Sequence, residues 1–194
     1  VLMESGIAQS VVDEMYQQEL QFRVGPTYKA GEKLVINPYR INYPQVGRYW
    51  SANNIRYKIV KKTDTEREVV AMNLSYAKDS DKNKVKKVVI PNTVALAGKT
   101  YRVVGVNKNA FKGLKKLTTV TIGKNVRNIG AKAFYGCKKL KTVKIQTKKC
   151  TFSGKSIWKK TSKKLVVKVP KSALKKMRKQ LKKSGLKAKA VKAA

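Results

Sequence analysis

Residues 109–117 read NAFKGLKKL, and a similar phrase, KAFYGCKKL, returns 23 residues later at residues 132–140. A fixed period of this size is typical of stacked repeat proteins, in which each unit buries its apolar face against its neighbours. In each copy the small alanine allows close backbone approach, and the aromatic Phe111 or Phe134 fills the space between coils. The repeat predicts a solenoid, and the alternative is a mixed α+β domain with accidental internal similarity.

One short strand is predicted in each unit, because apolar residues recur at positions 0, 3 and 5 and alternate side chains of a strand share a face. The spacing is seen at Leu117, Val120 and Ile122. The same spacing is seen at Val85, Val88 and Ile90 and at Leu140, Val143 and Ile145. A less regular copy, with a different spacing, follows at Leu165, Val167 and Val169. Four coils can be counted. The first is longer than the others, and we expect its extra residues to form a turn at residues 98–102.

Four segments resemble the BspA-like leucine-rich repeat proteins: IPNTV at residues 90–94, TVTIGKNV at 119–126, NIGAKAFYGC at 128–137 and VPKSAL at 169–174. The resemblance covers about residues 55–186. It implies a curved solenoid on secreted or surface-attached bacterial proteins, with roles in adhesion and in recognition of host matrix, partner cells or polysaccharide. It implies a binding module and supplies no catalytic residues.

The predicted fold class is an α/β repeat solenoid, with a right-handed leucine-rich repeat coil of about four units over residues 85–170. A β-hairpin-like cap over residues 55–84 precedes the coil. A basic capping helix and tail over residues 171–194 follow it. Ser172 is expected to cap this helix, whose narrow apolar stripe favours sealing the last coil over binding a membrane surface. The alanine-rich tail after Gly185 is expected to fray.

Residues 1–54 are predicted to form a separate region, with an amphipathic helix in the first 24 residues and an aromatic, proline-rich arm after it. The helix lacks the continuous apolar core of a secretion signal and is too short and charged to span a membrane. The arm either covers the first coil or docks on a neighbouring molecule. The candidate assembly contacts are Val12, Met15, Tyr16, Leu20, Tyr39, Tyr43 and Trp50.

The charge is unevenly distributed along the chain. Residues 1–54 carry equal numbers of basic and acidic side chains, so the whole net charge of +36 lies in residues 55–194. This shift places a domain boundary near residues 51–54. Such a field attracts polyanions, although lysine also serves simply to keep a repeat surface soluble. Only eight of the 46 basic residues are arginine, which favours diffuse attraction, including non-specific nucleic acid binding, over reading of a base sequence.

The residues offer little for catalysis. The chain contains no histidine, which removes the usual general base and the commonest metal ligand. Asp79 and Asp81 flank Ser80 without the glycine and distal glutamate of a calcium loop, so a turn is predicted there. Cys137 and Cys150 fall at different phases of the repeat and are expected to be free core thiols. The chain is therefore predicted to be non-enzymatic, with no cofactor and no metal.

The predicted function is a secreted or cell-surface bacterial module for binding or adhesion, which recognises a protein or an anionic polysaccharide or cell-wall polymer. The alternative is a structural subunit that docks or oligomerises through residues 1–50 and displays the basic repeats outside. Because the chain begins at Val1, we expect that processing or an incomplete sequence has removed an upstream segment such as a signal peptide. The candidate ligand-binding strand face consists of Thr119, Thr121, Thr142, Lys144 and Lys168.

Overall fold

The computed structural model describes residues 44–75 and 82–194. The chain divides into two units, Val1–Asn42 and Tyr43–Ala194, and the description below concerns the second. The predicted N-terminal helix, the acidic pair Asp79 and Asp81, and most of the candidate assembly contacts lie outside the described residues. Those contacts are Val12, Met15, Tyr16, Leu20, Tyr39 and Tyr43.

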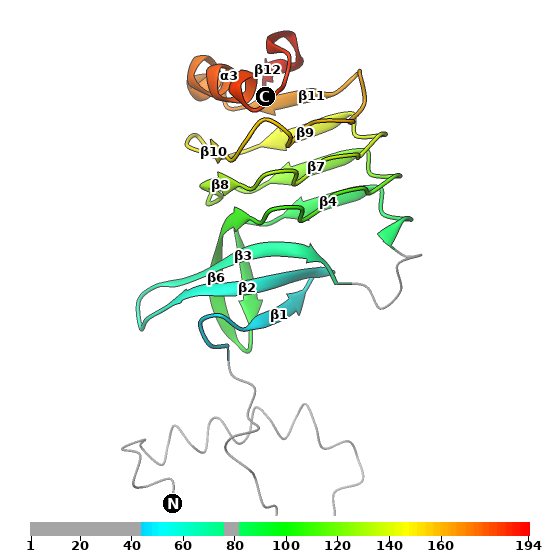
Figure 1. Cartoon of the computed structure of the whole chain (residues 1–194). Coiled ribbons are helices and arrows are strands. Elements are labelled where there is room, and N and C mark those ends of the chain that lie inside the picture. The colour runs from blue at the N-terminus through cyan, green and yellow to red at the C-terminus, as the bar shows by residue number, and fades with distance from the viewer. Residues whose placement is uncertain (1–43, 76–81) are drawn as a thin grey trace, which may run out of the picture. The chain divides into compact units, whose positions relative to one another are not determined.

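Five short parallel strands stack into one sheet along the repeats (Figure 1). They are β4 (Lys87–Ile90), β7 (Thr119–Ile122), β9 (Thr142–Ile145), β11 (Val166–Val169) and β12 (Val191–Ala193). Val120 and Val143 pair in register, and their side chains are wholly buried. The first four strands confirm the strands predicted from the apolar spacing. Because each strand pairs with the next copy of itself, the buried positions of successive units form continuous inward rows.

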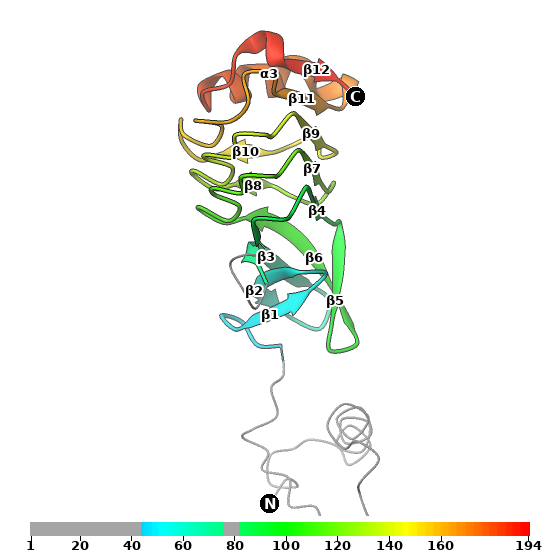
Figure 2. The same ribbon diagram turned by 90° about the vertical axis from the view of Figure 1, so that its right-hand side faces the viewer.

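A second sheet faces the other side of the repeats (Figure 2). Here β6 (Lys99–Val106), β8 (Asn128–Ile129) and β10 (Thr151–Phe152) pair in parallel. Strand β6 also pairs in parallel with β3 (Arg67–Leu74). This pairing joins the region before the repeats to the repeats themselves, so the two share one sheet and one core.

The strands before the repeats are antiparallel. Strand β1 (Tyr49–Ala52) pairs with β2 (Ile55–Lys62), and β2 pairs with β3. The turn between β1 and β2 is made by Asn53 and Asn54, which both have positive φ. The boundary expected near residues 51–54 therefore falls inside a hairpin, and the compact unit begins at Tyr43 instead. Charge composition shifts at this point, but backbone pairing continues across it.

The extra residues of the first coil form a β-hairpin in place of a simple turn. Strand β5 (Thr93–Leu96) pairs antiparallel with the start of β6. Ala97 and Gly98 make the turn, with φ of 45° and 69°. Val94, Leu96 and Tyr101 are buried on the inner face of this hairpin. The insertion therefore adds to the core.

A ladder of aromatic rings runs through the interior of the repeats. Phe111 and Phe134 stack with ring centroids 5.7 Å apart and an interplanar angle of 11°. Phe134 stacks in turn on Trp158 at 5.5 Å and 12°. Phe134 is 0% exposed, which confirms its predicted position between coils. Equivalent residues of successive units thus contact one another directly, as repeat stacking requires.

Gly130 is required for the close approach of neighbouring coils. A Cβ built on it would lie 2.4 Å from the backbone nitrogen of Lys108 in the preceding coil. Its own N–H donates to the carbonyl of Val106 at 2.8 Å. Lack of space between coils is therefore the reason for a glycine at this position.

The C-terminal segment ends the stack with helix α3 (Leu174–Lys183) and strand β12 (Figures 1 and 2). Met177 and Leu181 are buried. Ser172 does not cap this helix, because it lies in a 3₁₀ turn, η3 (Lys171–Ala173), and Ala173 occupies the cap position. The prediction of a frayed tail is wrong as well. After η4 (Ala188–Ala190), β12 pairs with β11, and Val191 is 1% exposed.

Candidate binding surfaces

The strand face predicted from the sequence is present as two outward rows of side chains. Strand pairing aligns Thr119 with Thr142, and it aligns Thr121 with Lys144 and then Lys168. All five candidate residues therefore lie on one face of the sheet, on adjacent strands about 4.8 Å apart. Lys144 and Lys168 are exposed, and the three threonines are half-buried.

Four further residues complete these rows and were not predicted as site residues. Lys87 aligns with Thr119, Val166 with Thr142, Val89 with Thr121, and Lys192 with Lys168. Lys87 and Val89 could have been identified from the strand predicted around Val88. Lys192 was missed because the tail was expected to fray. The second outward row is Val89, Thr121, Lys144, Lys168 and Lys192, and we call it the lysine row.

The charge on this face is not compensated locally. Residues 82–194 contain no aspartate or glutamate. The acidic residues that the structure describes are Asp64, Glu66 and Glu68, all at or near the turn between β2 and β3. Among the described residues, none of the row's lysines forms an ion pair with a carboxylate. The lysine row therefore presents positive charge that no neighbouring carboxylate of the described residues compensates.

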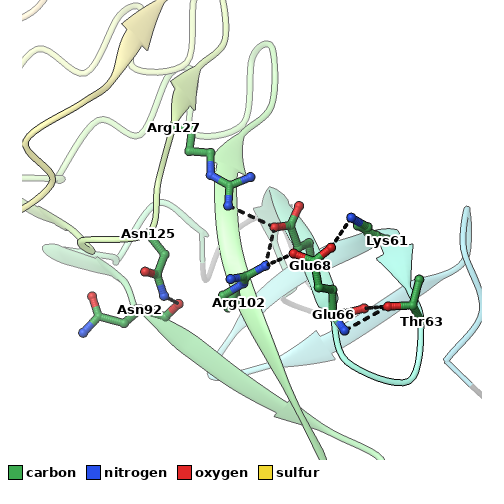
Figure 3. A network of polar contacts seen from close by, with 8 residues as sticks. All are labelled: Lys61, Thr63, Glu66, Glu68, Asn92, Arg102, Asn125 and Arg127. Carbon is green, nitrogen blue, oxygen red and sulfur yellow. Dashed lines mark hydrogen bonds and ion pairs between the residues drawn. The ribbon is translucent and has the colours of Figure 1, made fainter.

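An ion-pair network lies at the junction between the β2–β3 hairpin and the repeats (Figure 3). Glu68, which is 8% exposed, accepts contacts from Arg102 at 2.9 Å and Arg127 at 3.1 Å. Glu66 accepts a hydrogen bond from Arg102 at 2.9 Å and another from Lys61. These two hydrogen bonds, Lys61 first, lower the pKa of the Glu66 carboxyl below its ordinary value. The network connects strands β3 and β6 to the segment that enters β8.

A pocket of about 450 Å³ opens beside this network. Its lining comes from β6, from the segments that follow β7 and β9, from β10 and from α3. The lining residues are Arg102, Lys124, Asn125, Arg127, Thr147, Lys149, Cys150, Thr151, Lys176 and Gln180. None of them was predicted as a site residue, because no motif or period brings these separate segments together. We call this the lateral pocket.

Trp50, the one candidate assembly contact that the structure describes, lies on β1. Its side chain is half-buried and packs against the hydrophobic core of its own unit. The buried Nε1 of Trp50 has no hydrogen-bond partner within residues 44–75 and 82–194.

The two cysteines are free and buried, as predicted. Burial raises the pKa of the Cys137 thiol to about 11 and that of Cys150 to about 12. Cys137 donates a hydrogen bond from its thiol to the carbonyl of Phe111 at 3.1 Å. Both thiols are therefore protonated and unreactive at neutral pH. In residues 44–75 and 82–194 there is no cluster of three potential metal-ligating side chains among cysteine, aspartate and glutamate. No helix in the same residues is long and apolar enough to cross a membrane.

Comparison with solved structures finds similarity to three bacterial proteins. A leucine rich cell surface protein from Faecalibacterium prausnitzii A2-165 is 20% identical with a TM-score of 0.46, over 63% of this chain and 30% of that one. A leucine-rich repeat protein from Bacteroides ovatus ATCC 8483 is 19% identical with a TM-score of 0.41, over 63% of this chain and 38% of that one. The pneumococcal vaccine antigen PcpA is 14% identical with a TM-score of 0.31, over 67% of this chain and 52% of the antigen.

The chain thus spans between 30% and 52% of the length of these three proteins. No curated protein matches it. Residues 80–181, more than half of the chain, match the BspA type leucine rich repeat region in six copies. Within this span the structure has the four repeat strands β4, β7, β9 and β11. The chain belongs to the BspA-type leucine-rich repeat family.

Proposed function

We propose that the repeats form a non-enzymatic binding and adhesion module, secreted or displayed on the surface of a bacterium, which recognises an anionic polymer. The observation that carries this proposal is the lysine row. Lys144, Lys168 and Lys192 occupy paired positions on three adjacent parallel strands. A row with steps of about 4.8 Å offers a polymer several contacts at once. Each contact releases counterions from the polymer, and this release drives association at low salt.

The threonines beside the lysines favour an acidic polysaccharide or a cell-wall polymer over other polyanions. Thr119, Thr121 and Thr142 are half-buried and have their side chains on the same face as the lysines. A hydroxyl both donates and accepts hydrogen bonds, so it complements the hydroxyls of a sugar. Lysine meets the acidic groups as a point charge and requires no fixed geometry. A protein with an acidic surface is the second candidate, since exposed Val89 gives this row an apolar end.

Family membership supports the surface location, and one of the similar solved structures is named a cell surface protein. The proposal includes two features of the architecture: the right-handed sense of the coil, and a sealing role for α3 at the end of the stack. The buried side chains of Met177 and Leu181 support the second feature, because an open repeat end would leave them in water.

Charge reversal tests the proposal with a matched control. Lys144→Glu with Lys168→Glu changes two equivalent positions of the lysine row. Lys115→Glu with Lys138→Glu changes two equivalent, exposed positions in the turns before β7 and β9. Both variants lower the net charge by the same amount. Both should keep the parent melting temperature, because surface substitutions usually shift stability by only about 0.5 kcal/mol.

We expect the strand-face variant to bind heparin or teichoic acid about tenfold more weakly than the control at physiological salt, since contacts to charged groups contribute most to such binding. Equal losses in the two variants would mean that diffuse charge alone governs binding, and would remove the strand face as a site. Unrelated nucleic acid sequences should bind with similar affinity. Binding to one nucleic acid sequence at physiological salt, with weak binding to others, would contradict the proposal.

A further inference from the structure

The two edge strands of the repeat sheet, β4 and β12, differ in how their outer sides are covered. The N–H of Ala194 donates to the carbonyl of Val169 in β11 at 2.8 Å. Because backbone groups alternate between the two sides of a strand, the carbonyl of Val191 in β12 faces away from β11. That carbonyl accepts a hydrogen bond from the guanidinium of Arg178 at 3.2 Å. Helix α3 therefore protects this edge of the sheet.

Strand β4 has no such cover within the described residues, where it pairs with β7 alone (Figure 1). The carbonyls of Lys86 and Ile90 accept hydrogen bonds from the β7 side, at 3.2 and 2.9 Å. By the same alternation, the N–H and C=O groups of Lys87 and Val89 point to the free edge. A row of free backbone donors and acceptors is a template for pairing with another strand.

A groove of about 360 Å³ lies beside this edge, between β4 and the turn that joins β1 to β2. Most of its lining is apolar: Ile55, Leu74, Val85, Val88, Val89 and Pro91. Val85 and Pro91 are half-buried, and Val89 is 45% exposed, so a bound chain could contact all three. An added strand would occupy this groove and cover apolar surface that β4 now leaves open to water.

The charge around the edge indicates the chemistry of the occupant. Lys86 and Lys87 are exposed and form no ion pair among the described residues. Residues 82–194 contain no aspartate or glutamate. A second copy of this chain, with its net charge of +36, would be repelled. A polysaccharide lacks the regular N–H and C=O groups that pair with a strand, whereas an acidic peptide supplies both the pairing groups and the opposite charge.

We infer that the free edge of β4 binds an extended, acidic peptide segment of a partner protein, which adds a strand to the repeat sheet. The backbone groups of Lys87 and Val89 provide the pairing, and the groove accommodates the apolar side chains of the peptide. Acidic side chains of the peptide lie beside Lys87. This inference goes beyond the proposed function, because it does not depend on the lysine row binding any polymer.

Methylated peptides test the inference against simple charge attraction. The probe is a short fluorescent peptide in which valine and aspartate alternate, titrated into the full chain at physiological salt. One derivative carries N-methyl groups on its valines, and the other carries them on its aspartates. Alternate amides of a strand point to opposite sides, so only one derivative loses the donors that face β4. That derivative should bind about tenfold more weakly than the other.

The unmethylated peptide should bind saturably, and the weaker derivative shows whether the added strand is parallel or antiparallel to β4. Equal affinity of the two derivatives would overturn the inference, because they have the same charge and differ only in which amides can donate. Absence of saturable binding by the unmethylated peptide would overturn it as well.

Two substitutions at one position locate the site on the protein. Val89→Pro removes an N–H that faces the free edge, where proline is tolerated, and Val89→Ala keeps that N–H. The proline variant should bind the peptide about tenfold more weakly than the alanine variant. Melting temperatures establish that both variants fold, and the methylated peptides decide the question if the proline variant does not. Equal affinities in two folded variants would contradict pairing at β4.

Hydrogen exchange shows whether the edge is free in the full chain. The amide of Val88, which faces β7, should be protected with or without the peptide. The amide of Val89 should exchange freely in the protein alone and become protected when the peptide is added. Protection of Val89 without the peptide would mean that another segment already covers the edge, and would overturn the inference.

Discussion

The repeat strands and the strands before them achieve burial in different ways. In the repeats, four-residue parallel strands pair with copies of themselves, and the aromatic rings of successive coils stack with their planes nearly parallel. Before the repeats, eight-residue strands β2 and β3 pair antiparallel with two irregularities in their register. The acidic residues that the structure describes all lie in this earlier region. The comparison indicates that the stability of the repeats depends on contacts between equivalent residues of neighbouring coils. The stability of the hairpin region depends on antiparallel strand pairing and on the ion pairs at its junction with the repeats.

The largest expected effect is in the aromatic ladder. Phe134→Ala should lower the free energy of unfolding by about 3–5 kcal/mol, the usual cost of deleting a buried aromatic ring. The ring is wholly buried and contacts both Phe111 and Trp158. Urea denaturation measures the change. The neighbouring Tyr135, half-buried beneath Lys112 and Lys160, is the control, and Tyr135→Ala should cost about 1 kcal/mol. Equal costs would contradict stacking as the main source of stability in the repeats.

The close approach of coils at Gly130 predicts the next effect. Gly130→Ala should cost about 1–3 kcal/mol or more, because the new methyl group would overlap the Lys108 backbone and force the coils apart. Gly113 has a φ of 77° and open space around its Cβ direction. Gly113→Ala should therefore cost only the penalty of that backbone conformation, about 1–2 kcal/mol. A larger loss in melting temperature at Gly113 than at Gly130 would show that coil spacing adjusts easily.

The ion-pair network predicts a smaller effect at the junction of the two regions. Glu68→Gln should lower the free energy of unfolding by about 1–2 kcal/mol, since it removes a nearly buried carboxylate that two arginines contact. Glu66→Gln should have less effect, because the Glu66 side chain is 41% exposed and solvent screens its ion pairs. Hydrogen exchange of β3 and β6 amides should report the loss at the junction. Equal stability of the Glu68 variant and the parent would mean that backbone pairing alone holds the two regions together.

Lowering the pH should weaken the same ion-pair network. The pKa of Glu66 is lowered in the folded state, so its contribution to stability is fully present above the unfolded-state pKa. That contribution is lost as pH falls through the lowered folded-state pKa. NMR titration should therefore find a Glu66 midpoint below 4.5, and Lys61→Ala should raise it. A midpoint at or above 4.5 in the parent would contradict the hydrogen bond with Lys61.

The smallest expected effect concerns the reactivity of the two cysteine thiols in the folded protein. Because the pKa values of Cys137 and Cys150 are raised to about 11 and about 12, neither should react with a thiol reagent in the folded protein at pH 8. Both should react at once in denaturant. Rapid labelling of Cys137 in the folded state would show that the core of the repeats opens readily, in contrast to the closed packing described above.

The repeat strands, the burial of Phe134 and the five residues of the strand face could all be predicted from the sequence. These features depend on a period in the chain, and each unit repeats the same contact with its neighbour, so local spacing determines them. The predictions failed where no period operated. The hairpin of the first coil, the pairing of β12 and the continuity of β1 with β2 all depend on backbone hydrogen bonds that alternation of apolar residues does not specify.

The sequence by itself determined that apolar side chains stack in register and that lysine dominates the surface, because period and composition are local properties of the chain. The tertiary structure decided where those charges meet carboxylates and where they do not. Glu68 on β3 contacts Arg127 in the segment that enters β8, and Lys124, Lys149 and Lys176 line the lateral pocket from two loops and α3. Such contacts join residues far apart in the chain, and only the three-dimensional path of the backbone brings them within bonding distance.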